Sequence, residues 1–216
     1  MKEINLIRHA QTDYNKKGII QGSEVDSEID EEGIKQSKLF YDYYKNYNFE
    51  KIYISNLKRT FLTVKEFIND GVVYNPILNE FYWASLGQGS WCNNKRLRVS
   101  KRHDLTNCLI GTGIPFGNRV YKNFYKELDN MSKNSAGVRR LGAAALDLAY
   151  VASGKIDGFW ERDLNLWDIS SGVLLVKEAG GKITEPDGKK WTTNSRDIVV
   201  SNSLIHKKLT ENLTLL

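Results

Sequence analysis

Three side chains in the first part of the chain have types that suit phosphoryl chemistry. Arg8 and His9 directly follow a short apolar segment, Ile4–Ile7, and Arg59 lies in a later segment with helical periodicity. An imidazole can attack a phosphoryl group in line, and guanidinium groups bind its oxygens in pairs and stabilise the charge of the transition state. These residue types permit a nucleophile with a phosphate clamp; the alternative is a structural imidazole beside a surface arginine.

The elements that would position these residues alternate between strand and helix. Ile4–Ile7 and Lys51–Ser55 are predicted strands, and a loop is expected over Ala10–Asp30. A helix is predicted from Glu31, and a second one carries its apolar residues at the helical spacing of Leu57, Phe61, Val64 and Ile68. Such a β-α-β-α order favours a parallel sheet whose strand ends hold the active residues.

After Asp70 the pattern changes to a hairpin or meander that extends to about Val99. The later elements that we expect are strands at Cys108–Gly111, Phe159–Trp160, Lys182–Thr184 and Ile198–Val200, and helices around Arg119–Met131, over Gly142–Ser153, over Ile169–Ala179 and at the C-terminus. Gly111-Thr112-Gly113 lacks the Lys-Ser/Thr ending of a phosphate loop, so it is interpreted as the end of a strand. The fold class predicted for the whole chain is a layered α/β fold.

The charge is unevenly distributed along the chain. The formal net charge is +5, with 11 basic and 12 acidic side chains in residues 1–70 and 20 basic and 14 acidic side chains after them. This excess permits weak attraction to nucleic acid, but the basic residues between Lys95 and Arg102 are better explained as a charged hairpin edge, so no nucleic-acid partner is expected. No apolar run is long enough to span a membrane and no signal peptide is evident, so we expect a cytoplasmic chain without membrane contact. Cys92 and Cys108 are expected to be reduced thiols.

The first 69 residues resemble the histidine phosphatase (phosphoglycerate mutase-like) superfamily. The residues that carry the resemblance are Leu6-Ile7-Arg8-His9-Ala10-Gln11-Thr12-Asp13-Tyr14-Asn15, Gln21-Gly22 and Ser55-Asn56-Leu57-Lys58-Arg59-Thr60-Phe61-Leu62-Thr63. The resemblance implies that His9 is the nucleophile, that Arg8 and Arg59 clamp the phosphate, and that Asn15 lies near the substrate. Ala10 replaces the usual glycine, and the second histidine and the general acid of that family have no counterpart here, so this pocket is at best half built.

From about Gly71 the chain resembles the C-terminal half of the inositol monophosphatase family. The matching segments are Gly71–Ala84, Gly87–Asn93, Arg96–Ser100, Leu109–Gly113, Arg139–Tyr150, Asp157–Glu161 and Leu166–Gly172. The resemblance implies that Asp168 of the Trp-Asp motif is a Mg²⁺ ligand, and its place before a predicted helix also permits a role as N-cap. It implies further that Glu161 binds a substrate hydroxyl and that Gly142, Ala143 and Ala144 form the wall of the substrate pocket. The simpler alternatives are a helix cap, a surface carboxylate and tight helix packing.

The other metal ligands of that family come from a Gly-Glu-Glu segment and an Asp-Pro-(Leu/Ile)-Asp-Gly-Thr segment, and this sequence contains neither. Mg²⁺ prefers about six oxygen ligands in strict geometry, so one aspartate supports only a weak or partial site.

We therefore interpret the chain as two joined halves, residues 1–69 of histidine phosphatase type and residues 70–216 of inositol monophosphatase type. The leading hypothesis is a phosphomonoester hydrolase for a polyol phosphate, impaired because most Mg²⁺ ligands are missing. The alternatives are metal-independent phosphoryl transfer through His9 and a catalytically silent chimeric or scaffold protein. The expected partner is a small phosphate ester, and the second resemblance is compatible with a homodimer.

Overall fold

A computed structural model describes residues 7–21, 25, 27–46, 57–67, 70–114 and 123–214 of the chain. The described residues fall into two compact units, Met1–Asn69 and Asp70–Leu216. Helices and strands occur together, which confirms the α/β class. Among the described residues, no helix combines the length and the apolar character that crossing a membrane requires. The two cysteines are free thiols.

The first unit consists of helices in its described part. They are α1 (Asp13–Lys16), α2 (Glu31–Tyr44), α3 (Lys58–Val64) and the 3-10 helix η1 (Lys65–Phe67). The predicted strands at Ile4–Ile7 and Lys51–Ser55 lie outside the described residues, apart from Ile7. The two helices predicted from Glu31 and around Leu57 are present, whereas the expected loop between Ala10 and Asp30 contains α1.

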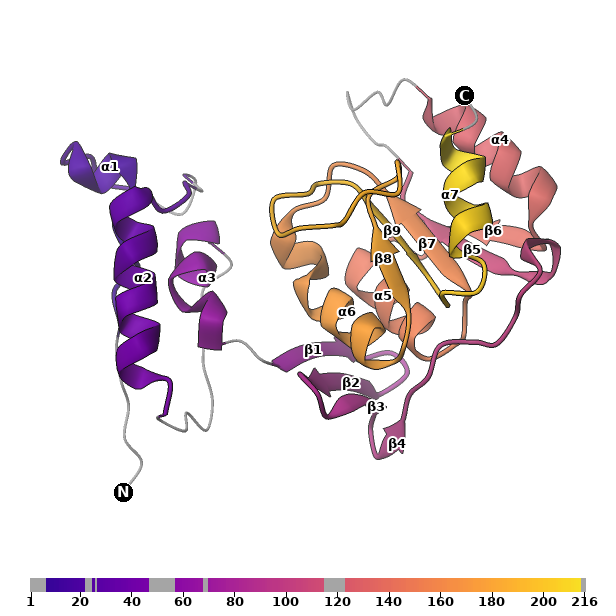
Figure 1. Ribbon diagram of the computed structural model, residues 1–216, viewed down its shortest axis with the longest axis horizontal. Helices are drawn as coiled ribbons and strands as arrows, with labels where there is room; N and C mark the ends of the chain where they lie inside the picture. Colours follow the sequence, from indigo (N-terminus) through magenta and orange to yellow (C-terminus); the bar gives the residue numbers. More distant parts are fainter. Residues whose placement is uncertain are drawn as a thin grey trace. The chain divides into compact units, whose positions relative to one another are not determined.

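Hydrogen bonds join α2 and α3 side by side (Figure 1). The Ser37 hydroxyl donates to the carbonyl of Leu62 or Thr63, at 3.0 and 2.8 Å. Asp30 caps α2 by accepting from the Gly33 amide at 2.8 Å. The helix buries Gly33 and Ser37, while Ile34 remains 54% exposed, so the small polar face of α2 rather than its apolar residues makes the contact.

The second unit contains two sheets. The first is antiparallel, with strand order β1-β2-β3-β4, and the second has the order β6-β5-β7-β9-β8. β5 pairs in parallel with β6 and β7, whereas β9 is antiparallel to β7 and β8. The strands are β1 (Asp70–Asn75), β2 (Glu80–Ser85), β3 (Gly89–Cys92), β4 (Lys95–Arg96), β5 (Leu109–Thr112), β6 (Gly137–Arg139), β7 (Gly158–Glu161), β8 (Lys182–Thr184) and β9 (Ile198–Ser201).

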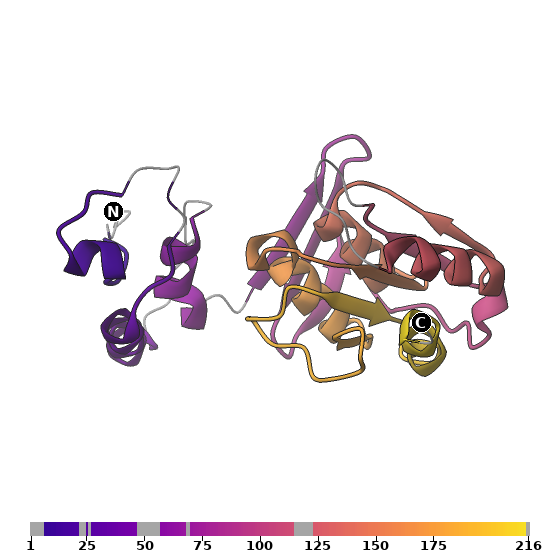
Figure 2. The same ribbon diagram turned by 90° about the horizontal axis from the view of Figure 1, so that it is seen from above.

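Helices separate and cover these sheets. They are η2 (Leu105–Asn107), α4 (Phe124–Asn134), α5 (Ala144–Ala152), α6 (Leu166–Glu178) and α7 (His206–Thr214). Figure 1 shows α5 and α6 between the two sheets, and Figure 2 shows α4 and α7 side by side on the other face of the five-stranded sheet. The resulting order of layers is sheet, helix pair, sheet, helix pair.

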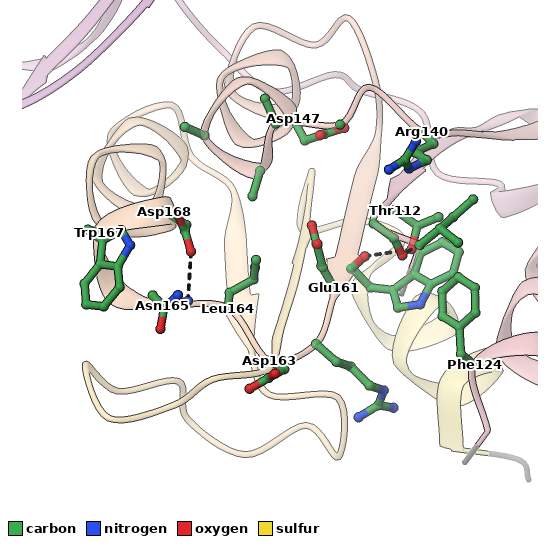
Figure 3. A pocket seen from close by; sticks show the side chains of 18 residues that line it. Thr112, Phe124, Arg140, Asp147, Glu161, Asp163, Leu164, Asn165, Trp167 and Asp168 are labelled. Atoms are coloured by element: carbon green, nitrogen blue, oxygen red, sulfur yellow. Dashed lines mark hydrogen bonds between the residues drawn. The ribbon is translucent and has the colours of Figure 1, made fainter. Parts of the chain in front are cut away.

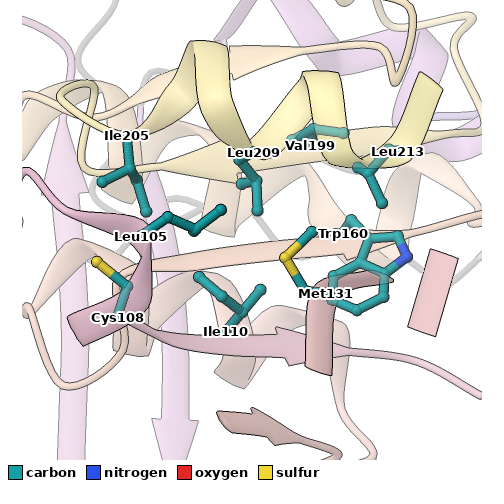
Figure 4. Packing of buried hydrophobic residues seen from close by; sticks show 9 residues of the cluster. All are labelled: Leu105, Cys108, Ile110, Met131, Trp160, Val199, Ile205, Leu209 and Leu213. Atoms are coloured by element: carbon teal, nitrogen blue, oxygen red, sulfur yellow. The ribbon is translucent and has the colours of Figure 1, made fainter. Parts of the chain in front are cut away.

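The core of the second unit lies on both faces of the five-stranded sheet. On one face, Ile110, Trp160 and Val199 from three neighbouring strands contact Met131 of α4 and Leu209 of α7 (Figure 4). The central strands are buried on both sides, which explains why they are nearly continuous apolar runs instead of alternating ones.

A buried histidine, His206, makes the stability of the second unit depend on pH. His206 is 2% exposed, its Nε2 lies 2.9 Å from the Thr184 hydroxyl and its Nδ1 lies 2.7 Å from the Ser201 hydroxyl. Burial, assisted by the charge of Lys182, lowers the pKa of His206 to about 4. The unfolded chain takes up a proton near pH 6.5 and the folded chain only near pH 4, so stability is present above pH 6.5 and is lost as pH falls between these values.

We expect the contribution of His206 to the free energy of unfolding, taken as the difference between the native chain and His206→Gln, to fall by on the order of 2–3 kcal/mol between pH 7 and pH 4. Urea titrations at both pH values measure the loss. His206→Gln should reduce this pH dependence, whereas His103→Gln, at an exposed position, should leave it unchanged. The same acid dependence in His206→Gln and in the native chain would contradict the assignment.

Candidate active site

A cavity of about 410 Å³ opens in the second unit where β5 and β7 end and where α5 and α6 begin. Figure 3 shows the side chains of Asp147, Glu161, Asp168 and Arg140 around this space. These side chains line a common volume together with Arg162, Asp163 and the first turns of two helices.

The end of β5 is shaped to admit a carboxylate. Thr112 donates its hydroxyl to the Trp160 carbonyl at 2.9 Å and so ties β5 to β7. A Cβ on Gly113 would lie 2.0 Å from the carboxyl carbon of Glu161, the last residue of β7. Only a glycine leaves room for the Glu161 side chain in this position. Gly113 thus has a role in the site beyond ending the strand.

The start of α5 offers backbone donors to the cavity. Gly142 has φ +85°, a left-handed conformation that favours glycine. Ala143 is the N-cap and makes no side-chain cap, and Ala144 begins the helix. The first amides of a helix have no partner within it and carry a partial positive charge, which suits an anion. Gly142, Ala143 and Ala144 line the cavity, and their small side chains keep this helix end accessible.

Asp147 is a site residue that the sequence did not single out. It is 1% exposed, lines the cavity, and its Oδ1 has no hydrogen-bond partner in the described part of the chain. Burial, followed by the negative charge of Glu161, raises the pKa of Asp147 to about 8. Gly111 makes room for it, because a Cβ there would lie 2.8 Å from Oδ1. In the sequence, this residue could have been recognised as an acidic side chain within the otherwise largely apolar helix Ala144–Ala152.

Asp168 lies in the first turn of α6, with its side chain half-buried. Its Oδ2 accepts a hydrogen bond from the Asn165 amide at 3.0 Å, and Asn165 is the N-cap. The prediction that Asp168 itself caps the helix is therefore wrong by three residues, because the helix begins earlier, at Leu166. The carboxylate stabilises the helix start from the third helical position, as in a capping box.

The carboxylates of the cavity do not assemble a metal cage on their own. Within the described ranges, no three His, Cys, Asp or Glu side chains are placed so that they could hold a metal ion. The raised pKa of Asp147 opposes Mg²⁺ binding at this residue, because a carboxyl group must lose its proton to act as a ligand. The donor set thus does not fit a complete Mg²⁺ centre.

The structure places the four predicted residues of the first unit in the following surroundings. The His9 Nδ1 lies 2.8 Å from the Ala10 carbonyl, and Arg8 is exposed. Arg59 is buried and donates to the Val25 carbonyl at 2.5 Å. The side-chain oxygen of Asn15 accepts a hydrogen bond from the hydroxyl of Thr12, the N-cap of α1.

Thr63, a residue of α3, forms a hydrogen bond with the backbone next to His9. Its hydroxyl accepts from the Ala10 amide at 2.8 Å and donates to the Arg59 carbonyl at 2.7 Å. The structure thereby links the backbone next to His9 to the helix that carries Arg59.

The fold and the cavity define a layered α/β protein in which the start of α5 and several carboxylates line one cavity. Residues 62–215 match the model of the inositol monophosphatase family, and the chain belongs to this family. Residues 4–96 match the model of the histidine phosphatase superfamily (branch 1). Both resemblances seen in the sequence are confirmed.

Relatives and solved structures cover the same part of the chain. The inositol-1-monophosphatase of Caulobacter vibrioides is 46% identical over 146 residues, which are 66% of this chain and 57% of the relative. The Nus factor SuhB of Pseudomonas aeruginosa is 41% identical over 145 residues, 66% of this chain and 54% of the relative. The native crystal structure of the extragenic suppressor protein suhB from Bartonella henselae has a TM-score of 0.65 and 43% identity and covers 67% of this chain and 57% of that one. The structure of the inositol monophosphatase from Anabaena has a TM-score of 0.66 and 37% identity, and the match covers 68% of this chain and 59% of that one. The chain thus spans a little over half the length of these relatives.

The close contact at Gly113 leads to a prediction. We expect Gly113→Ala to displace the Glu161 carboxylate and to weaken binding of a polyol phosphate by roughly tenfold or more, the loss of about one charged hydrogen bond. Calorimetric titration with myo-inositol 1-phosphate measures the effect. Gly137→Ala is the matched control, because its Cβ would meet mainly the flexible Arg139 guanidinium, at 3.2 Å. Equal affinity of the two variants would show that Glu161 does not contact the ligand.

Proposed function

We propose that the chain is a phosphomonoester hydrolase of inositol monophosphatase type with low turnover, acting on a small polyol phosphate. The observation that carries the proposal is the cavity in which the N-terminus of α5 faces Glu161 and Asp168. The helix amides and Arg140 bind the phosphate oxygens, and the Glu161 carboxylate accepts a hydrogen bond from a ring hydroxyl.

Low turnover follows from the donor set. Family membership makes Mg²⁺ the expected cofactor, and Asp168 is the residue proposed to bind it. A single carboxylate that also accepts from the Asn165 amide holds such an ion weakly. The chain's own residues can bind and orient the ester, but they do not by themselves activate water.

The experiment is an assay of phosphate release from myo-inositol 1-phosphate with Mg²⁺ and with EDTA. We expect release at least about a hundredfold slower than by the Caulobacter vibrioides enzyme assayed in parallel, a barrier higher by about 2.7 kcal/mol. EDTA and Asp168→Asn should abolish it, and His9→Ala should leave it unchanged. Loss of activity only in His9→Ala would overturn the proposal.

A second candidate, phosphoryl transfer through His9, has one structural observation in its favour. If the Nδ1 of His9 carries its proton toward the Ala10 carbonyl, the Nε2 lone pair remains available for attack. This route needs no metal, so the EDTA arm of the same assay separates it from the first. Absence of turnover by either route would leave the third candidate, a silent scaffold.

A further inference from the structure

The four-stranded sheet of the second unit has one buried face and one exposed apolar face. On β2, Tyr82 and Ala84 are fully buried where α5 and α6 pack against the sheet (Figure 1). Side chains alternate along a strand, so the intervening residues point away from these helices. Of these, Phe81 on β2 is 44% exposed and Tyr74 on β1 is 53% exposed.

The register gathers the side chains of the outward face into one patch. We call this patch the outer face: Val72, Tyr74, Phe81, Trp83 and Trp91. Val72 is opposite Trp83 and Tyr74 is opposite Phe81, while Trp83 is opposite Trp91 on the next strand.

The rings of the outer face are held in place by one another. The rings of Trp83 and Trp91 stack with centroids 5.7 Å apart and planes within 9°. The Arg96 guanidinium lies 5.8 Å from the centroid of the Trp91 ring. Rigid aromatic side chains lose little conformational entropy on binding, and they are enriched at the centres of protein interfaces.

The apolar surface continues past the strands. In the turn between β1 and β2, Ile77 is 90% exposed and Leu78 is 56% exposed. Contiguous exposed apolar surface of this kind marks an interaction site more often than a solvated surface.

The comparisons show what share of a solved family member this chain does not match. About two fifths of the Bartonella henselae structure has no counterpart in this chain, since only 57% of it is covered. Among the described residues β1 lies at an edge of its sheet, and the match to the family model begins at residue 62, shortly before β1, so the matched part of the fold starts close to the outer face. A sheet with two apolar faces requires a packed layer on each.

We propose that the outer face binds a second polypeptide that carries the remaining part of the inositol monophosphatase fold. That polypeptide supplies the missing layer over Tyr74 and Phe81 and meets the open edge of β1. The proposal concerns assembly and does not depend on catalysis by this chain.

The test is co-purification of the tagged full chain with a defined probe. The probe is the part of the Caulobacter vibrioides inositol-1-monophosphatase outside its 146 matched residues, co-expressed as a separate polypeptide. We expect a 1:1 complex by light scattering and a change in tryptophan fluorescence, because Trp83 and Trp91 lie in the interface.

Two variants on the outer face and one elsewhere make the test specific. Phe81→Lys and Val72→Lys should weaken the complex at least tenfold, whereas Leu204→Lys, at an apolar position 59% exposed outside the outer face, should not. Near-ultraviolet circular dichroism of each variant verifies that it is folded. Absence of a complex, or a complex that neither outer-face variant weakens, overturns the proposal. If the chain instead forms a homodimer and Phe81→Lys dissociates that dimer, the outer face binds a second copy of the chain. This result would also overturn the proposal.

Discussion

Asp147→Asn is expected to stabilise the fold increasingly as pH rises. The pKa of the Asp147 carboxyl is raised to about 8, first by burial and then by Glu161. The unfolded chain loses this proton near pH 3.8 and the folded chain keeps it until about pH 8, so the native chain loses stability as pH rises through this interval. An amide of the same shape does not titrate. The variant should match the native chain near pH 4 and exceed its free energy of unfolding by several kcal/mol at pH 8, since each pKa unit corresponds to about 1.4 kcal/mol.

Urea unfolding at pH 4.5 and pH 8 measures this effect, with Asp129→Asn as the control because Asp129 is exposed and forms a surface ion pair with Lys133 on α4. The same stability difference between Asp147→Asn and the native chain at both pH values would contradict the raised pKa. A buried acid that costs stability at neutral pH is typical of a functional site.

Asp157→Ala is expected to destabilise the second unit by about 3–5 kcal/mol, because its side chain is fully buried and joins three segments. Its Oδ1 accepts from the Ser100 hydroxyl at 2.5 Å and from the Arg102 guanidinium at 2.9 Å, and its Oδ2 accepts from the Leu109 amide at 2.8 Å. Alanine removes the acceptor of the Leu109 amide at the start of β5 and the buried partner of Arg102, next to the strands that lead to Gly113 and Glu161.

Thermal unfolding and urea titration measure the loss. Asp187→Ala removes an exposed carboxylate that pairs with Lys189 in a turn and should change stability by less than about 0.5 kcal/mol. Similar losses in the two variants would show that the Asp157 contacts contribute little.

Periodicity and turn residues predicted most elements of the second unit. The strand at Lys182–Thr184 has the predicted bounds, and the helix predicted over Gly142–Ser153 is α5, Ala144–Ala152. The strand expected at Cys108–Gly111 is shifted by one residue, and the helix expected at Ile169 begins at Leu166. The helix start differs because hydrogen bonds of the cap, such as that between Asn165 and Asp168, set a helix end and leave little trace in apolar spacing.

The site was only partly predictable. Glu161 and the Gly142–Ala144 wall follow from the family motif and line one cavity. Asp147 was missed because a lone acid in a helix is ordinarily solvated, and only the packing of α5 against the sheet shows that it is buried. The role of Gly113 depends on a contact between two strands that are distant in sequence, which no local pattern contains.

The position of α5 and α6 between the two sheets has a consequence for biosynthesis. The hairpins that carry Tyr82 and Ala84 leave the ribosome well before Leu166, the first residue of α6. At about 5–20 residues per second, translation leaves the inner apolar surface of this sheet uncovered for several seconds. The nascent chain therefore presents both surfaces of one sheet to the cell at once, and a chaperone that binds extended apolar segments has its best opportunity in this interval.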